Sequence, residues 1–209
     1  RLVVKGRQTH GAMPWAGVDP VVVASQIVLG LQTVVSRQID LTQAPAVVTV
    51  GTIEGGTRHN IVPDEVRMSG TIRTFDPEMR KEILARVRRT AQSIAEAAGA
   101  TAEVILDEGY PVTWNDPALT ERMTPSLKRV AAATFNPNAQ PTTTSEDFSY
   151  YGQQVPALYF FLGVAPKGTD PAAWAANHSP RFSPDEAALV TGVRALASLA
   201  VDFLGGAGK

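Results

Sequence analysis

Side chains able to bind a metal ion are few in this sequence. It contains no cysteine and three histidines, His10, His59 and His178, whereas a catalytic zinc site usually takes about three protein ligands. His178 lies in the segment NHSPRF, just ahead of a predicted helix. A lone loop histidine is most often only solvated. A metal-binding role for His178 therefore needs partner ligands that the spacing of these residues does not reveal.

Four other polar residues lie in segments where chemistry is possible. They are His10 after a predicted strand, Asn60 after two glycines, Arg73 near the end of an alternating strand, and Glu146 in TSEDF. An imidazole N–H can donate to negative charge developing on a carbonyl oxygen, and a guanidinium can bind a carboxylate through two hydrogen bonds. Each residue also has a simpler interpretation. His10 and Asn60 could be turn residues, Arg73 could serve only solubility, and Glu146 could lie at a helix start capped by Ser145.

Composition limits the classes of partner. The chain has 209 residues, of which 44% are hydrophobic and 19% charged, with a formal net charge of −1. Nucleic acid or an anionic membrane would call for a basic excess, so neither is expected as a partner. No apolar run is expected to approach a transmembrane length. No signal peptide is recognisable, and a cytoplasmic location is expected.

The first 109 residues alternate between two periodicities. Period-two and β-branched segments predict strands, and apolar residues at helical spacing after an Asp-Pro pair predict helices. The predicted strands are 1–9, 44–56, 62–75 and 101–109, and the predicted helices are 17–38 and 76–99. This β-α-β-β-α-β order predicts a four-stranded antiparallel sheet with both helices on one face.

The remaining residues, 110–209, predict helices but little sheet for them to cover. A helix over 115–135 should break or kink at Pro125, and 156–166 is predicted as a buried strand. The last helix, 183–204, carries a capping-box pattern in Ser183 and Glu186. This combination predicts the tail of a larger α/β domain. Because the chain starts with Arg1 inside a strand pattern, the natural protein is expected to continue upstream.

Four segments resemble one family in the same order. KGRQTHGAMPWAGVDPV, VTVGTIEGGTRHNIVPDEVRMSGTIRTFD, TTTSEDFSYY and NHSPRF are similar to segments of the dinuclear zinc amidohydrolases related to aminoacylase, carboxypeptidase and hippurate hydrolase. The long second segment is most similar to the hippurate hydrolase and auxin-conjugate hydrolase branch. The resemblance covers nearly the whole chain.

This resemblance implies a catalytic domain that is interrupted by a β-α-β-β-α-β lid. Residues 1–109 would be the lid, which mediates homodimerisation, and residues 110–209 the C-terminal part of the catalytic domain. Family members hold two zinc ions, and manganese or cobalt are possible substitutes. Only His178 matches a metal ligand; the other ligands and the glutamate base are expected upstream of Arg1. This chain alone is therefore expected to be metal-poor and inactive.

The resemblance also implies roles for the other candidates. His10 and Asn60 would polarise the substrate carbonyl, Arg73 would bind the substrate carboxylate, and Glu146 would contact substrate at the rim of the site. Met13 and Trp15 are expected to pack rather than react. Asn60 and Arg73 are separated by a predicted strand, and at about 3.3 Å per residue they are tens of ångströms apart. We therefore expect His10 and Asn60 to act on the partner subunit's site.

The expected activity is hydrolysis of an N-acyl amino acid to a carboxylate and a free amino acid. One alternative is a metallo-exopeptidase of the same superfamily that acts on peptides. Another is a non-catalytic dimerisation module, in which the β-α-β-β-α-β unit carries the function.

Overall fold

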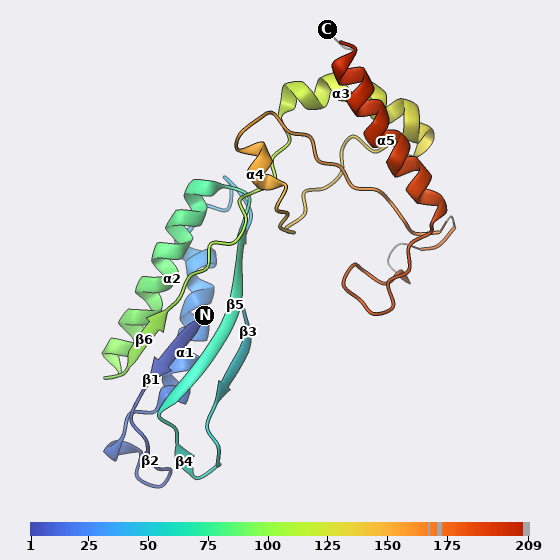
Figure 1. Ribbon diagram of the computed structural model, residues 1–209. Helices are drawn as coiled ribbons and strands as arrows, with labels where there is room; N and C mark the ends of the chain where they lie inside the picture. The colour runs from blue at the N-terminus through green and yellow to red at the C-terminus, as the bar shows by residue number, and fades with distance from the viewer. Residues whose placement is uncertain (167, 171–172, 207–209) are drawn as a thin grey trace. The chain divides into compact units, whose positions relative to one another are not determined.

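The chain divides into two compact units, Arg1–Val112 and Thr113–Lys209. The structure, a computed structural model, describes residues 1–166, 168–170 and 173–206 (Figure 1). The first unit contains the whole of the main hydrophobic core. The second unit buries far fewer apolar side chains; among its described residues these are Met123, Leu127, Ala157 and Ala195.

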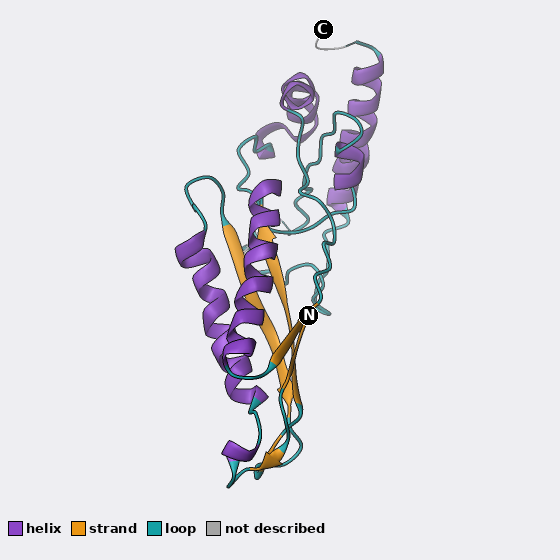
Figure 2. Cartoon of the chain, turned by 90° about the vertical axis from the view of Figure 1, so that its left-hand side faces the viewer, coloured by secondary structure: helices purple, strands orange, loops and turns teal. Residues whose placement is uncertain are grey.

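The first unit is built on a four-stranded antiparallel sheet with the strand order β3-β5-β1-β6. These strands are β1 (Leu2–Lys5), β3 (Ala46–Gly55), β5 (Glu65–Thr74) and β6 (Thr101–Val104). Helices α1 (Pro20–Gln38) and α2 (Pro77–Ala97) lie on the same side of this sheet (Figure 2). The predicted β-α-β-β-α-β arrangement is therefore confirmed. A second, two-stranded sheet pairs β2 (Thr9–His10) with β4 (Ile61–Val62).

Both helices begin and end at the residues that the sequence indicates. The carboxylates of Asp19 and Asp76 accept hydrogen bonds from backbone N–H groups in the first turns, where Pro20 and Pro77 lack an N–H to satisfy. Gly99, after α2, has a φ of +73°, which favours glycine. The fully packed helix side chains are Val23, Ala24, Ile27, Leu31 and Val34 of α1, and Met79, Ile83, Val87, Ala91 and Ala95 of α2.

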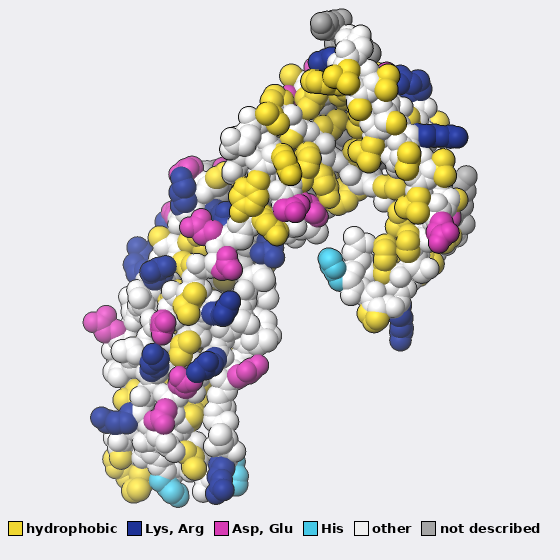
Figure 3. Space-filling view, in the orientation of Figure 1, with side chains coloured by type: hydrophobic (Ala, Val, Ile, Leu, Met, Phe, Trp, Pro, Cys, Tyr) yellow, Lys and Arg dark blue, Asp and Glu magenta, His cyan; other side chains and the backbone are white. Residues whose placement is uncertain are grey.

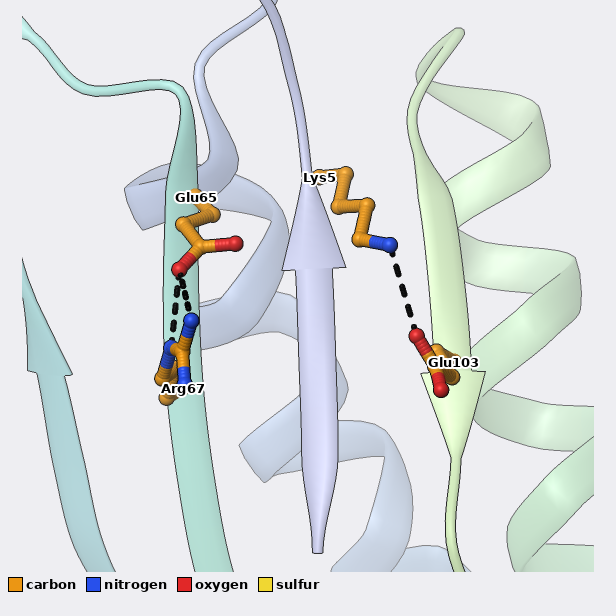
Figure 4. A network of polar contacts seen from close by, with 4 residues as sticks. All are labelled: Lys5, Glu65, Arg67 and Glu103. Atoms are coloured by element: carbon orange, nitrogen blue, oxygen red, sulfur yellow. Dashed lines mark hydrogen bonds and ion pairs between the residues drawn. The ribbon is translucent and has the colours of Figure 1, made fainter.

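The face of the sheet without helices is polar (Figure 4). Arg67 Nη2 lies 2.6 Å from Glu65 Oε1, and Lys5 Nζ lies 3.3 Å from Glu103 Oε2. These exposed pairs stabilise the fold only weakly, but they keep this face soluble. The period-two alternation predicted for the third strand is confirmed, and Arg73 continues the row of polar residues near the end of β5.

One position on β5 brings two backbones unusually close together. The pairing of β3 with β5 shifts by one residue after Val50, so that Gly51 has no partner in the register. A Cβ on Gly70 would lie 2.0 Å from the carbonyl oxygen of Thr49, whereas a Cβ on Gly51 would meet nothing nearer than 3.9 Å. The sheet therefore requires glycine at position 70 and tolerates a side chain at position 51.

Among its described residues the second unit contains three α-helices, α3 (Pro117–Ala131), α4 (Ser149–Gly152) and α5 (Ala187–Leu204), and a short 3-10 helix, η2 (Ala132–Thr134). Of the break or kink expected at Pro125, the break is absent, since α3 continues through this residue. Proline removes only one N–H donor, and Met123 and Leu127 remain buried on either side. The predicted capping box of Ser183 and Glu186 is also wrong. The Asp185 carboxylate instead accepts the N–H of Ala187 at 2.9 Å.

Residues 156–166 do not form the predicted buried strand. A strand needs a neighbouring strand to satisfy its backbone groups, and the described part of this unit supplies none. Two contacts with the loop before α3 hold the segment instead. The Asp116 N–H donates to the Ala157 carbonyl oxygen at 2.9 Å, and the Asn115 side chain binds the backbone of Tyr159.

Two helices, α1 and α5, are long and apolar enough to cross a membrane, contrary to the expectation that no apolar run approaches this length. Length and composition do not separate a membrane helix from a core helix, and α1 is a core helix of the first unit. α5 differs, since only Ala195 is buried. Its predicted packing stripe is largely exposed, and hydrophobic side chains gather over this part of the unit (Figure 3). The exposed large residues include Val190, Val193, Leu196 and Phe203.

A polar cluster joins α3 to α5 and predicts acid sensitivity. The Asp202 carboxylate accepts hydrogen bonds from Ser126 and Arg129, which lower the pKa of Asp202 below its ordinary value of 3.8. A lowered pKa contributes stability that is present above pH ~4 and is lost as the pH falls through the folded-state pKa. We expect Asp202→Asn to reduce stability at pH 7 and to flatten the loss of stability as the pH falls below ~4. Thermal unfolding across this range checks it, and an unchanged pH profile would contradict it.

Candidate active-site residues

His10 and Asn60 lie next to each other at one end of the first unit. The β2–β4 pairing places His10 opposite Ile61, and the Gly11 N–H donates to the Asn60 carbonyl oxygen at 2.8 Å. A Cβ on Gly11 would lie 3.0 Å from that oxygen, so glycine permits this approach. Fifty positions of sequence separate the two residues, and the small sheet brings them together.

The ring of His10 is oriented by its own loop. The Ala12 N–H donates to His10 Nδ1 at 3.0 Å. A neutral imidazole whose Nδ1 accepts a hydrogen bond carries its proton on Nε2. His10 is exposed, so this arrangement leaves an N–H donor at the surface, beside Asn60. Such a donor suits a carbonyl oxygen that gains negative charge.

The loop after His10 differs from expectation. Met13 and Trp15 are 48% and 79% exposed, so the prediction that they pack is wrong for the structure of this chain. Hydrogen bonds from Met13 N to the His10 carbonyl oxygen and from Gly17 N to the Pro14 carbonyl oxygen shape the loop into a short 3-10 turn. Because the turn satisfies its own backbone, it holds Trp15 outward.

Arg73 lies near the other end of β5 from Asn60. β5 has ten residues, and a strand of that length spans about 30 Å. β3 pairs with β5 from Val66 to Thr74, so no sharp bend in β5 shortens the distance between Asn60 and Arg73. Arg73 is half-buried, and its Nη1 donates to the Ile72 carbonyl oxygen at 3.1 Å. Within the first unit, the structure therefore joins His10 with Asn60 and separates both from Arg73.

Glu146 lies in a loop of the second unit, just before α4. Its carbonyl oxygen accepts hydrogen bonds from the Ser149 N–H at 3.1 Å and from Ser149 Oγ at 2.6 Å. The alternative reading of Ser145 as a helix cap is wrong, because Phe148 occupies the cap position of α4 and makes no side-chain cap. Burial first, and then the charge of Glu146, raise the pKa of Tyr159 above its ordinary value of 10, a proximity that sequence reasoning missed because Tyr159 looked like part of a buried strand.

His178 occupies an exposed turn with an unusual backbone. Its φ is +70°, a conformation that few residues other than glycine adopt. The Ser179 N–H donates to the Ala176 carbonyl oxygen at 3.1 Å, closing a turn with His178 at its third position. Strained backbone of this kind is enriched at functional sites. The imidazole is exposed and able to serve as one metal donor.

The rest of a metal site is not formed by the described residues. Over residues 1–166, 168–170 and 173–206, no group of three or more His, Asp or Glu side chains is placed to hold a metal ion. One imidazole suits zinc or a similar ion chemically, but it does not complete a site. His178 therefore fits a metal as a single ligand among donors that other parts of a protein would supply.

Comparison with known proteins shows which proteins this chain is similar to. Residues 1–98 match the peptidase dimerisation domain, M20_dimer. Thermostable carboxypeptidase 2 of Saccharolobus solfataricus is 36% identical over 204 residues, which are 97% of this chain and 50% of that protein. N-acetyl-L-cysteine deacetylase of Bacillus subtilis is 35% identical over 190 residues, or 91% and 43% of the two proteins. The chain spans about half the length of the curated relatives it matches.

Solved structures extend the likeness to three dimensions. The YXEP protein of Bacillus subtilis, described as a dinuclear metal binding peptidase from the M20 family, aligns with a TM-score of 0.70 and 29% identity over 98% of this chain and 50% of that one. A tripeptidase of Staphylococcus aureus, at 19% identity and a TM-score of 0.72 over 95% of this chain and 49% of that one, shares the fold. Residues 1–98 therefore match the peptidase dimerisation domain, and nearly the whole chain is similar to carboxypeptidases and deacetylases and to a dinuclear metal binding peptidase of the M20 family.

Proposed function

We propose that this chain is part of a metal-dependent amidohydrolase that cleaves N-acyl amino acids to a carboxylate and a free amino acid. The observation that carries the proposal is the His10–Asn60 pair, with its oriented Nε2 proton, in a chain related to deacetylases. Those relatives include N-acetylcysteine deacetylase of Bacillus subtilis and N-acetyldiaminopimelate deacetylase of Leuconostoc citreum, at 35% and 36% identity.

Each candidate residue has a role in this proposal. His10 Nε2 and the Asn60 amide donate hydrogen bonds to the carbonyl oxygen of the scissile amide. Arg73 binds the carboxylate of the amino acid, and Glu146 contacts the substrate at the rim. Two zinc ions, or manganese or cobalt, polarise the carbonyl and lower the pKa of bound water when present. His178 is one metal ligand, and the others, with the general base, come from residues outside this chain.

The alternative is a metallo-exopeptidase, which the similarity to two thermostable carboxypeptidases favours. Hydrolysis of N-benzoylglycine and N-acetyl amino acids, compared with that of dipeptides, by the full-length protein loaded with each metal separates the two. Higher kcat/KM on the acyl amino acids supports the proposal, and higher kcat/KM on dipeptides overturns it. No hydrolysis with any metal would favour the non-catalytic dimerisation module.

A homodimer through the first unit is the second part of the proposal. β3 is an edge strand of ten residues whose one charged residue is Glu54. Val47 and Ile53 on it are 46% and 50% exposed. A long edge strand with few charges pairs readily with another strand unless something covers it. β6, the other edge, has four residues and bears Glu103. We therefore assign β3, paired antiparallel with its own copy, as the centre of the dimer.

Charges on this edge are expected to abolish dimerisation. Lysine at an edge strand opposes strand addition, so Val47→Lys combined with Ile53→Lys should shift the chain from dimer to monomer without unfolding it. Size-exclusion chromatography with light scattering measures the mass, and circular dichroism checks the fold. Ile105→Lys, which alters a similarly exposed isoleucine beyond β6, is the matched control. A folded double variant that stays dimeric would exclude β3 as the interface.

We also infer that residues 110–209 are the C-terminal part of the catalytic domain and that the remainder of that domain covers α5. The exposed stripe on α5 and the half-length match to the relatives support this assignment. If the remainder of the catalytic domain covers α5, this helix lies in a protein core. We propose that neither a membrane nor nucleic acid is a partner, and we expect the protein in the cytoplasm.

A further inference from the structure

A short loop at one end of the first unit leaves a tryptophan exposed. Trp15 lies in the 3-10 helix η1 (Pro14–Ala16) and is 79% exposed, and Met13, directly before η1, is 48% exposed. Hydrophobic and histidine side chains gather at this end of the unit, where β2 and β4 lie (Figures 1 and 3). Single exposed apolar residues are common on protein surfaces, so exposure by itself assigns Trp15 no role.

Backbone contacts fix the loop that carries Trp15. A bridge between Arg7 and Val18 closes the base of the loop through two hydrogen bonds, of 2.9 and 3.0 Å. The Met13 carbonyl oxygen accepts a backbone N–H of η1 at 3.0 Å. A Cβ on Gly17 would lie 2.4 Å from the Arg7 carbonyl oxygen, so the two ends of the loop meet backbone against backbone. Trp15 is therefore held in place before any ligand binds, which lowers the entropy cost of binding.

The same loop orients the hydrogen-bond donor of His10. The His10 carbonyl oxygen accepts the Met13 N–H at 2.8 Å, and the Ala12 N–H donates to His10 Nδ1 at 3.0 Å. One rigid segment thus presents both the His10 donor and the exposed indole of Trp15. Apolar surface with a few placed polar groups is the usual composition of a small-molecule site. The pair suits a carbonyl group that bears an apolar substituent.

The position of Arg73 decides which side of a substrate this loop would meet. In an N-acyl amino acid, the carboxylate and the acyl group lie on opposite sides of the scissile amide. Under the proposed function Arg73 binds the carboxylate, and it does so from the other subunit, because β5 separates it from His10 by about 30 Å. The carboxylate side is therefore bound away from the His10 loop, which leaves the acyl side to face Trp15.

We propose that Trp15 is a specificity-determining residue whose indole packs against an apolar acyl group of the substrate in the partner subunit's site. The inference rests on the proposed function, since it takes the reaction and the place of His10 from it. A tryptophan fixed in this way gives a large contact area at little cost in side-chain entropy. A benzoyl ring can use that area, whereas an acetyl group has too little apolar surface to gain much from it.

The first experiment compares N-benzoylglycine with N-acetylglycine as substrates of the full-length protein loaded with metal. Trp15→Ala should lower kcat/KM about 30-fold on the benzoyl substrate, the loss expected for a tryptophan that carries a contact, and less than about 3-fold on the acetyl substrate. Trp15→Phe, which keeps a ring, should retain most of the wild-type ratio. Trp114→Ala is the matched control, since Trp114 is also exposed, at 67%, but lies in the second unit.

Circular dichroism checks that each variant is folded. Trp114→Ala should leave the ratio of the two kcat/KM values unchanged. Equal losses on both substrates in Trp15→Ala would overturn the specificity role while leaving the proposed function intact. A wild-type protein that hydrolyses no N-acyl amino acid would refute the proposed function and this inference with it.

Mixed dimers test whether Trp15 acts together with His10. When His10→Ala/Trp15→Ala is mixed with Arg73→Ala, the complete site takes His10 and Trp15 from the same subunit and should keep the wild-type substrate ratio. When His10→Ala is mixed with Arg73→Ala/Trp15→Ala, that site takes His10 from a subunit without Trp15, and the ratio should fall about 10-fold. Equal ratios in the two mixtures, or no recovered activity in either, would overturn the proposal.

Discussion

Two inactive variants of the full-length protein are expected to restore activity when mixed. His10→Ala should lower kcat about 100- to 1,000-fold, the usual cost of one oxyanion donor. Arg73→Ala should lower kcat/KM by a comparable factor, since truncating a charged partner of a carboxylate costs about 2–5 kcal/mol. The two residues lie toward opposite ends of a strand of about 30 Å, so one small substrate in one subunit does not reach both.

Recovery follows if each site takes His10 from one subunit and Arg73 from the other. In a hybrid dimer, one site then receives both intact residues and the other receives neither. Random exchange makes half of the dimers hybrid, so about a quarter of the wild-type activity should return. Mixing His10→Ala with a His10→Ala/Arg73→Ala double variant is the control and should restore nothing. Absence of recovery in the first mixture, with subunit exchange verified, would place both residues in one subunit's site.

Alanine at Gly70 is expected to destabilise the first unit strongly, whereas alanine at Gly51 is not. The Cβ added at Gly70 would lie 2.0 Å from the Thr49 carbonyl oxygen, which is backbone and moves only with the strand. The cost should be about 3 kcal/mol, near the upper range for overpacking. A Cβ added at Gly51, in the bulge, would meet only the Ser69 carbonyl oxygen at 3.9 Å, an ordinary contact distance, so Gly51→Ala should change stability by less than about 1 kcal/mol.

Urea denaturation followed by circular dichroism measures both variants. The two changes add the same methyl group to neighbouring glycines of paired strands, so the comparison isolates the close approach. Equal stability of Gly70→Ala and Gly51→Ala would contradict the observed pairing of β3 with β5.

Local chemistry was predictable wherever short-range interactions decide the structure. Asp19-Pro20 and Asp76-Pro77 begin helices because a carboxylate and a proline satisfy a first turn with no help from elsewhere. The alternation from Val66 to Arg73 placed one face of β5 on the core, because strand side chains alternate by geometry. The same alternation groups Gly70 with Val66 and Met68, but Gly70 is exposed, and nothing in the sequence marked it as a point of close approach to Thr49.

The candidate site was predicted only in part. Motif context singled out His10 and Asn60 separately, and their contact arises from the β2–β4 sheet, a pairing across about fifty residues. Tyr159 escaped notice because its apolar surroundings predict a buried strand, whereas the Asn115 side chain holds its backbone in a loop.

The sequence by itself determined the β-α-β-β-α-β order, the ends of α1 and α2, the polar face of the sheet and the segments that carry chemistry. Each depends on neighbours within a few positions or on a repeating side-chain direction. Only the tertiary structure decided which apolar stripe is covered, since α1 lies on a sheet while α5 leaves Val193 and Leu196 exposed. It also decided that residues 156–166 are held by Asn115 instead of by a strand. Burial and pairing require a partner distant in sequence, and a periodic pattern shows that a segment needs one without showing which one it finds.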